Sequence, residues 1–187
     1  MLLADADQHA RADVRRLLVS LGQDVVAEAG DAASALHLAR RIRPDVALVE
    51  LRLPGGSGLK LLAREQLLAV VALSAPGDPE AARRAAYAGA GAFLAKPADE
   101  RRLLAAMEVA LARFHSAQEL RSEAARLREE LDTERLIERA KGLLMAEHDL
   151  TAEAAAARLT ALAARTGKTP RETASAIVLT HNASSRD

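Results

Sequence analysis

The sequence predicts an open, doubly wound α/β domain followed by a segment made only of helices. Up to Pro97, five short apolar runs alternate with amphipathic helical patterns. The runs are bounded by polar residues or glycine and are too short for helices, which is typical of buried strands. From Asp99 onward helical periodicity replaces this alternation. Strands that alternate with helices form a parallel sheet covered on both faces, here five-stranded.

The strands are expected, in order, at residues 1–4, 24–29, 46–49, 69–73 and 92–95. Two of the intervening helices have recognisable starts. Asp31 is expected to cap one helix, and Asp78, followed by Pro79 at the first helical position, is expected to begin another. Gly22 and Gly89 stand where two helices should end.

A long helix with a coiled-coil pattern is predicted after the last strand. Apolar residues recur there every three to four positions, flanked by Glu and Arg, with Arg113 as the one interruption. The pattern contains Leu103, Ala106, Ala110, Ala117, Leu120, Ala124, Leu127 and Leu131. We expect dimer contacts over its last part, at Ala117, Leu120, Ala124, Leu127 and Leu131. A second stripe, expected to pack on the α/β domain, contains Leu104, Met107, Leu111 and Phe114.

The C-terminal part predicts three further helical stretches. One contains LIERAKGLLMAEH, one begins at Thr151 and one begins at Thr169, where TPRE matches a capping box with proline at the first helical position. We therefore expect an α/β domain over 1–113 and a three-helix domain over 131–183. A coiled-coil linker helix over 99–135 should join them and continue the last helix of the α/β domain.

Composition excludes several classes of protein. The net charge is zero, so no general basic field indicates nucleic acid or an acidic membrane. The absence of cysteine excludes disulfides, thiol catalysis and cysteine-based zinc sites. The histidines are scattered without ligand spacing, and no metal site is expected from them. No apolar run approaches the ~20 residues of a membrane span, and no signal-peptide layout is present, so we expect a cytoplasmic protein.

Polar side chains follow several of the predicted strands. In a doubly wound sheet the loops at the carboxyl ends of the strands form the ligand crevice. The side chains that fall there are those of Asp5, Asp7, Glu50, Ser74 and Lys96. Three acids, a hydroxyl and a lysine in one crevice form the first candidate site.

These residues, with the Lys96-Pro97 pair, resemble the receiver domain of two-component response regulators, which has a flavodoxin-like fold. The resemblance implies an aspartate that accepts a phosphoryl group beside a divalent cation. Here Glu50 stands at the acceptor position and Ala6 at that of a cation-binding acid. We therefore expect a receiver that is not phosphorylated in the usual manner and binds Mg²⁺ weakly or not at all.

Two questions about this receiver stay open in the sequence. Glu50 is expected to reach Lys96, either in partial imitation of the phosphorylated form or as a structural ion pair. The imitation would be incomplete, since a phosphorylated side chain carries roughly −1.5 to −2 charges. Phe93 matches the aromatic residue whose rotamer reports the switch state in the family, and it could equally be ordinary core.

Residues 131–182 resemble the ANTAR domain, the RNA-binding output of certain bacterial transcription antiterminators. The resemblance depends on AKGLLM, which begins at Ala140, on LIER before it, and on the new helix at Thr151. The candidate RNA-binding residues are Arg139, Ala140, Lys141, Gly142, Arg158 and Arg165. No aromatic residue follows Phe114, so any stacking on bases must use arginine or the imidazoles of His148 and His181.

Gly142 is expected in the middle of a helix, where glycine is unfavourable by ~1 kcal/mol relative to alanine. Either tight packing against another helix or contact with an RNA backbone would explain its presence.

The sequence thus predicts an RNA-binding transcription antitermination regulator with an atypical receiver, dimeric through the coiled coil and not an enzyme. The resemblance implies tandem stem-loops in a leader transcript as the target. The alternative is a protein-interaction regulator, in which the receiver binds a partner that controls the C-terminal helices. A phosphorylation-driven switch is third, disfavoured by Ala6 and Glu50.

Overall fold

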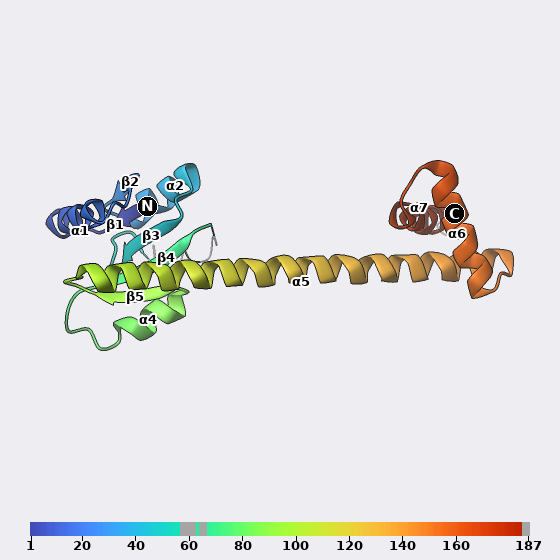
Figure 1. Ribbon diagram of the computed structural model, residues 1–187. Coiled ribbons are helices and arrows are strands. Elements are labelled where there is room, and N and C mark those ends of the chain that lie inside the picture. The colour runs from blue at the N-terminus through green and yellow to red at the C-terminus, as the bar shows by residue number, and fades with distance from the viewer. Residues whose placement is uncertain (57–62, 64–66, 185–187) are drawn as a thin grey trace. The chain divides into compact units, whose positions relative to one another are not determined.

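The computed structural model describes residues 1–56, 63 and 67–184 and confirms the predicted fold class. Ser57 and Gly58 of the loop after the third strand lie outside the described residues. Five parallel strands form one sheet in the order β2-β1-β3-β4-β5 (Figure 1). They are β1 (Leu2–Ala4), β2 (Ala27–Ala29), β3 (Val46–Glu50), β4 (Ala69–Ser74) and β5 (Ala92–Ala95). The strand order reverses between β1 and β3, which is where doubly wound sheets bind ligands.

Helices cover both faces of the sheet, because successive strand side chains point to opposite faces. Leu2 belongs to the core beneath α2 (Ala32–Ile42) and α4 (Ala81–Ala88). Its neighbour Leu3 belongs to the core beneath α1 (Gln8–Ser20) and the first turns of α5. Both leucines are fully buried. The sheet is therefore buried on both sides, and its ligand-accessible part is the edge at the carboxyl ends of the strands.

Helix α5 is continuous from Glu100 to His148 (Figure 1). Its first turns do not follow the predicted coiled-coil seam, since Leu103, Ala106 and Ala110 are buried against the sheet, together with Met107. The approach is close, because a Cβ added at Gly91 would lie 2.9 Å from the Cα of Ala110. The assignment of these three residues to the coiled-coil pattern was wrong, because they pack on the sheet.

Two of the predicted helix boundaries illustrate how local signals succeed and fail. Asp31 caps α2 as predicted, and its carboxylate accepts the Ser34 N–H at 2.9 Å. The predicted start at Asp78 is wrong, because α4 begins three residues later at Ala81 with no side-chain cap. The Asp78 carboxylate accepts the Glu80 N–H at 3.2 Å in the turn before α4 and also makes tertiary contacts.

The end of α5 packs with α6 (Ala152–Thr166) and α7 (Pro170–Ser184). Their shared core consists of Ala140, Leu144, Ala155, Leu159, Ala174 and Val178. The predicted capping box at the start of α7 is confirmed. The Thr169 hydroxyl accepts the Glu172 N–H at 3.2 Å, and the Glu172 carboxylate accepts the Thr169 N–H at 2.8 Å. In the described part of the chain, no helix has the length and apolar character that a membrane crossing needs.

Candidate functional site

Lys96 brings together the carboxylates that follow β1 and end β3. Its Nζ donates to Oδ2 of Asp5 and to Oε2 of Glu50. The Lys96 backbone N–H donates to the carbonyl of Ser74 at 2.9 Å, which fixes the residue at the end of β5. The Asp5 side chain is 1% exposed, and those of Glu50 and Lys96 are 14% and 17% exposed. We call these three side chains the lysine triad.

The lysine triad is a largely dehydrated cluster of two acids and one base. Burial alone would lower the pKa of Lys96, because it disfavours the charged ammonium. The hydrogen bonds from Asp5 and Glu50 and their negative charge outweigh burial and raise the pKa of Lys96 above its ordinary value. Lys96 therefore remains protonated at neutral pH.

Both carboxylate oxygens of Asp5 accept hydrogen bonds. Its Oδ1 accepts the Asp7 N–H at 3.0 Å, while Oδ2 accepts from Lys96. Arg11 on α1 donates to the Asp5 carbonyl at 2.6 Å and to Glu28 at 3.2 Å, and so holds the loop after β1. The sequence did not point to Arg11, because a contact with a backbone carbonyl leaves no pattern of residue types.

Two predicted members of the acidic pocket do not join the lysine triad. The carboxylate of Asp7 caps α1, accepting the N–H groups of His9 and Ala10 at 2.8 and 3.2 Å. These two hydrogen bonds, that with Ala10 foremost, hold the pKa of Asp7 below its usual value. The Ser74 hydroxyl donates to the carbonyl of Ala75 at 2.8 Å.

These contacts do not fit the divalent cation that the family resemblance implies. Such a cation takes several oxygen ligands, chiefly carboxylates, at one place. Asp5 and Glu50 both neutralise Lys96, Asp7 serves as a helix cap, and Ala6 has no donor atom. Among the described residues no group of three or more acidic or histidine side chains could hold a metal ion.

A second charged cluster lies at the same edge of the sheet and was not predicted. Asp78, between β4 and α4, accepts hydrogen bonds from Arg52 at 3.0 Å and from Arg84. These hydrogen bonds, that of Arg84 foremost, lower the pKa of Asp78 to about 2. Asp78 thus ties the loop after β4 to the loop after β3. Phe93 on β5 is half-buried against the α2 and α4 core, a position that suits core packing.

The predicted RNA-binding residues near the end of α5 differ widely in exposure. Ala140 is fully buried and belongs to the core, so its side chain offers no contact to a ligand. Lys141 is paired with Glu138 at 2.8 Å, and Arg139 lies 3.5 Å from Asn182. Gly142 is exposed, and a Cβ added there would meet no atom of the described residues within 4 Å. Packing among those residues does not explain that glycine.

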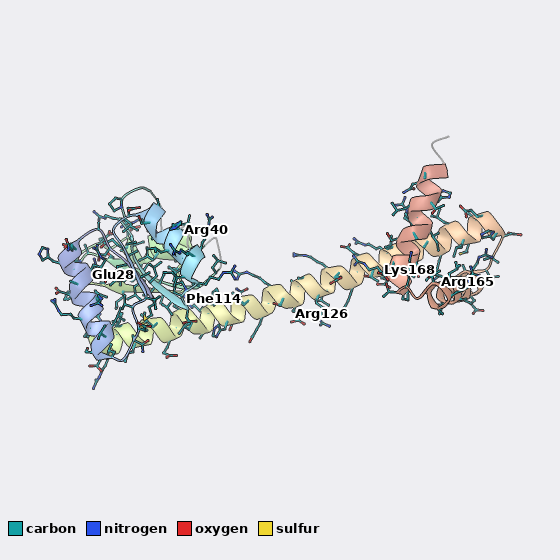
Figure 2. All side chains as sticks on the ribbon, turned by 90° about the horizontal axis from the view of Figure 1, so that it is seen from above. Glu28, Arg40, Phe114, Arg126, Arg165 and Lys168 are labelled. Atoms are coloured by element: carbon teal, nitrogen blue, oxygen red, sulfur yellow. The ribbon has the colours of Figure 1, made fainter. Side chains whose placement is uncertain are left out.

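The arginines of α6 lie on one flank of the helix. Arg158 and Arg165 are seven residues apart, which is two helical turns or roughly 10 Å along the axis. Both are exposed, as is Lys168 in the connection to α7. Figure 2 labels Arg165 and Lys168. Within the ranges that the structure describes, none of the three forms an ion pair.

The predicted dimer residues lie on the open surface of α5 in the single chain. Leu120, Leu127 and Leu131 are 68%, 46% and 52% exposed. Ala117 and Ala124 are half-exposed. We call these five residues the α5 stripe.

A parallel sheet with acids and a lysine at its carboxyl edge, followed by a helical unit, has the organisation of a receiver with an output domain. A family model described as the response regulator receiver domain matches residues 1–108, and one described as the ANTAR domain matches residues 125–178. The chain belongs to the response regulators that join a receiver domain to an ANTAR domain. PdtaR of Mycobacterium tuberculosis (strain ATCC 25618 / H37Rv), a transcriptional regulatory protein, is 35% identical over 154 residues, which cover 81% of this chain and 75% of PdtaR.

Other relatives match the receiver part. The nitrate/nitrite response regulator protein NarP of Escherichia coli (strain K12) is 38% identical over 112 residues, 57% of this chain and 52% of NarP. The receiver domain of AraT, a response regulator from Geobacillus stearothermophilus, superposes with a TM-score of 0.52 at 31% identity, covering 63% of this chain and 95% of that structure. The receiver domain of a modulated diguanylate cyclase from Desulfovibrio desulfuricans G20 gives 0.55 at 29% identity, covering 62% and 95%.

Proposed function

We propose that this protein is an RNA-binding transcription antitermination regulator and not an enzyme. The observation that carries the proposal is the ANTAR match over residues 125–178. ANTAR domains are the RNA-binding output of certain bacterial transcription antiterminators, and we extend that role to this segment. The same segment carries three exposed cations, Arg158, Arg165 and Lys168, which suit contacts to phosphates. Among the described residues the two arginines form no ion pair. The proposed target is a pair of stem-loops in a leader transcript, whose stabilisation prevents a terminator hairpin from forming.

The proposed active form is a homodimer joined through the α5 stripe. Three exposed leucines on one side of a continuous helix favour association with a second copy. Two linked copies of a small RNA-binding domain suit two adjacent loops, because the first binding event raises the effective concentration of the second domain.

In this proposal the receiver does not respond to phosphate. Lys96, which would pair with a phosphorylated carboxylate, is already bound by Asp5 and Glu50. The triad is satisfied without a cation and without a phosphoryl group. The signal that sets the state of the helical domain is then the RNA itself or a protein that binds the receiver. The second possibility corresponds to the protein-interaction regulator considered from the sequence.

RNA selection followed by binding titrations tests the proposal. A pool of two-hairpin RNAs with randomised loops would be selected on the wild-type protein and the enriched RNA titrated at several salt concentrations. We expect binding that weakens with salt, because phosphate contacts release counterions. The double substitution Arg158→Gln/Arg165→Gln should weaken binding and reduce the salt dependence.

Arg41→Gln/Arg101→Gln is the matched control, since it removes the same charge from exposed arginines of the receiver. The control should bind as the wild type does. If no RNA is enriched, the proposed function is wrong, and the protein-interaction regulator becomes the better account.

A further inference from the structure

A cavity of about 430 Å³ lies between the end of α5, α6 and α7. Its apolar wall consists of Leu144 from α5, Leu162 from α6 and Ile177 from α7. Leu144 is buried, whereas Leu162 and Ile177 are half-buried, so the wall is apolar surface open to a ligand. We call it the three-helix cavity.

Polar and charged side chains surround the three-helix cavity. Arg158, His148 and Lys168 line it, and none of them is in an ion pair within the part of the chain that is described. The only acid in the lining, Glu147, is paired with His181, whose Nδ1 lies 2.7 Å from Oε1 of Glu147. The rim therefore presents the Arg158 guanidinium with no carboxylate partner among the described residues, and beside it Lys168, whose charge also acts on Glu172. This arrangement suits a ligand that is apolar and flat in one part and anionic in another.

The side chains that can stack on a nucleobase come together here. The chain has no aromatic residue after Phe114, so bases can stack only on guanidinium or imidazole planes in this domain. The two histidines of the domain, His148 and His181, and the exposed Arg158 all line the same cavity. Their convergence is independent of the family match, which identifies no individual residue.

We propose that the three-helix cavity accepts one unstacked base of an RNA loop. Leu162 and Ile177 contact one face of the base, the guanidinium of Arg158 or an imidazole of His148 or His181 stacks on the other face, and Lys168 contacts a neighbouring phosphate. The Glu147 carboxylate accepts a hydrogen bond from an N–H group on the edge of the base. This inference depends on the proposed RNA binding and assigns it a base-specific site. It moves the main recognition site from the exposed residues of the AKGLLM segment to the cavity, to which that segment contributes Leu144.

Filling the cavity tests the inference without disturbing the core. Ala176 lines the cavity from α7 and is exposed, so Ala176→Leu occupies the space with a good helix former. Ala161→Leu is the matched control, because Ala161 is exposed on α6 and is not part of the lining. Both variants should keep the circular dichroism and melting temperature of the wild type.

The ligand is the two-hairpin RNA selected on the wild-type protein, together with a series in which each loop nucleotide in turn is abasic. For the wild type and for Ala161→Leu, removal of the base at one loop position should lower the affinity for the RNA roughly 10-fold or more. Ala176→Leu should bind the intact RNA about as weakly as the wild type binds that abasic RNA. The abasic RNA should then bind Ala176→Leu no more weakly than the intact RNA does.

Two results would overturn the inference while RNA binding stands. Ala176→Leu could bind the intact RNA as the wild type does, or the full abasic penalty could persist in Ala176→Leu. Either result places the base elsewhere on the domain. A wild-type protein that enriches no RNA would refute the proposed function and this inference together.

Discussion

Lys96 after β5 binds Glu50 at the end of β3 and, through the same ammonium group, Asp5 after β1. The triad thus connects the carboxyl ends of three strands at the edge where the strand order reverses. One lysine opposes two carboxylates, so the cluster has a formal charge of −1 and depends on the lysine for its stability. The consequences of removing each partner differ.

Lys96→Met should lower the free energy of unfolding by about 3 kcal/mol, because it leaves the fully buried Asp5 carboxylate without its cation. Glu50→Gln is the control. Its amide oxygen can still accept from Lys96, and Asp5 stays paired, so we expect a change below about 1 kcal/mol. Urea denaturation of both variants measures the difference. Equal losses would show that Asp5 does not depend on Lys96.

Restoring the two missing acids should restore cation binding. The double substitution Ala6→Asp/Glu50→Asp supplies a second acid in the first loop and shortens the acceptor by one methylene. We expect the melting temperature of this variant to rise with Mg²⁺, since a ligand that binds only the folded state stabilises it. The wild type should show no such rise.

Acetyl phosphate followed by intact mass measurement extends the same comparison. We expect an adduct on the double variant and none on the wild type. An adduct on the wild type that disappears in Glu50→Ala would contradict our account of the receiver.

The sequence predicted those parts of the fold that depend on residues close together in the chain. The five strands, the Asp31 cap and the Thr169 capping box each need only a few adjacent residues, and all are present. The start at Asp78 was wrong. Oδ1 of Asp78 accepts the Glu80 N–H at 3.2 Å within a turn that precedes α4, and Oδ2 accepts from Arg52, which is far away in the sequence.

The candidate site was predictable only in part for the same reason. Strand ends placed Asp5, Glu50 and Lys96 together, because parallel strands share one edge. Whether Asp7 faces the pocket or caps α1 depends on the geometry of a single loop, which residue types do not determine. The three-helix cavity needs the packing of three helices and has no signature in any one of them.

Asp78 should make stability depend on acid pH. Its folded pKa of about 2 lies below its ordinary value of 3.8, so its contribution is fully present above pH 4 and is lost as pH falls towards 2. Asp78→Asn should therefore be less stable than the wild type at pH 6, and the difference in urea midpoint should shrink between pH 4 and pH 2. A difference that stays constant over this range would rule out the carboxylate as its source.

Gly142→Ala should raise the free energy of unfolding by roughly 0.5–1 kcal/mol, because the position is helical, exposed and free of neighbouring atoms. Gly91→Ala is the opposite control, since its Cβ would lie 2.9 Å from the Cα of Ala110 and should destabilise the receiver. Denaturation measures both. A stabilised Gly142→Ala variant that loses RNA binding or dimerisation would show that another molecule approaches the glycine closely.

The α5 stripe should control the oligomeric state. Leu127→Glu/Leu131→Glu places two charges in the proposed seam, where burial of an unpaired carboxylate is strongly unfavourable, and should yield a monomer in analytical ultracentrifugation. Leu179→Glu is the control, because Leu179 is also an exposed leucine, 66% exposed on α7, but lies outside the stripe. It should leave the dimer intact.

The absence of cysteine allows the orientation of the two helices to be tested in the same chain. In a parallel, in-register dimer each residue of the stripe faces its own copy, so Leu120→Cys and Leu131→Cys should both form intermolecular disulfides on mild oxidation. A disulfide needs Cα atoms within about 7 Å of each other. In an antiparallel pair at most one of these two positions can lie at the crossing point, so a single positive variant would indicate the antiparallel arrangement. If neither variant cross-links and the wild type is monomeric, the α5 stripe is not a dimer seam.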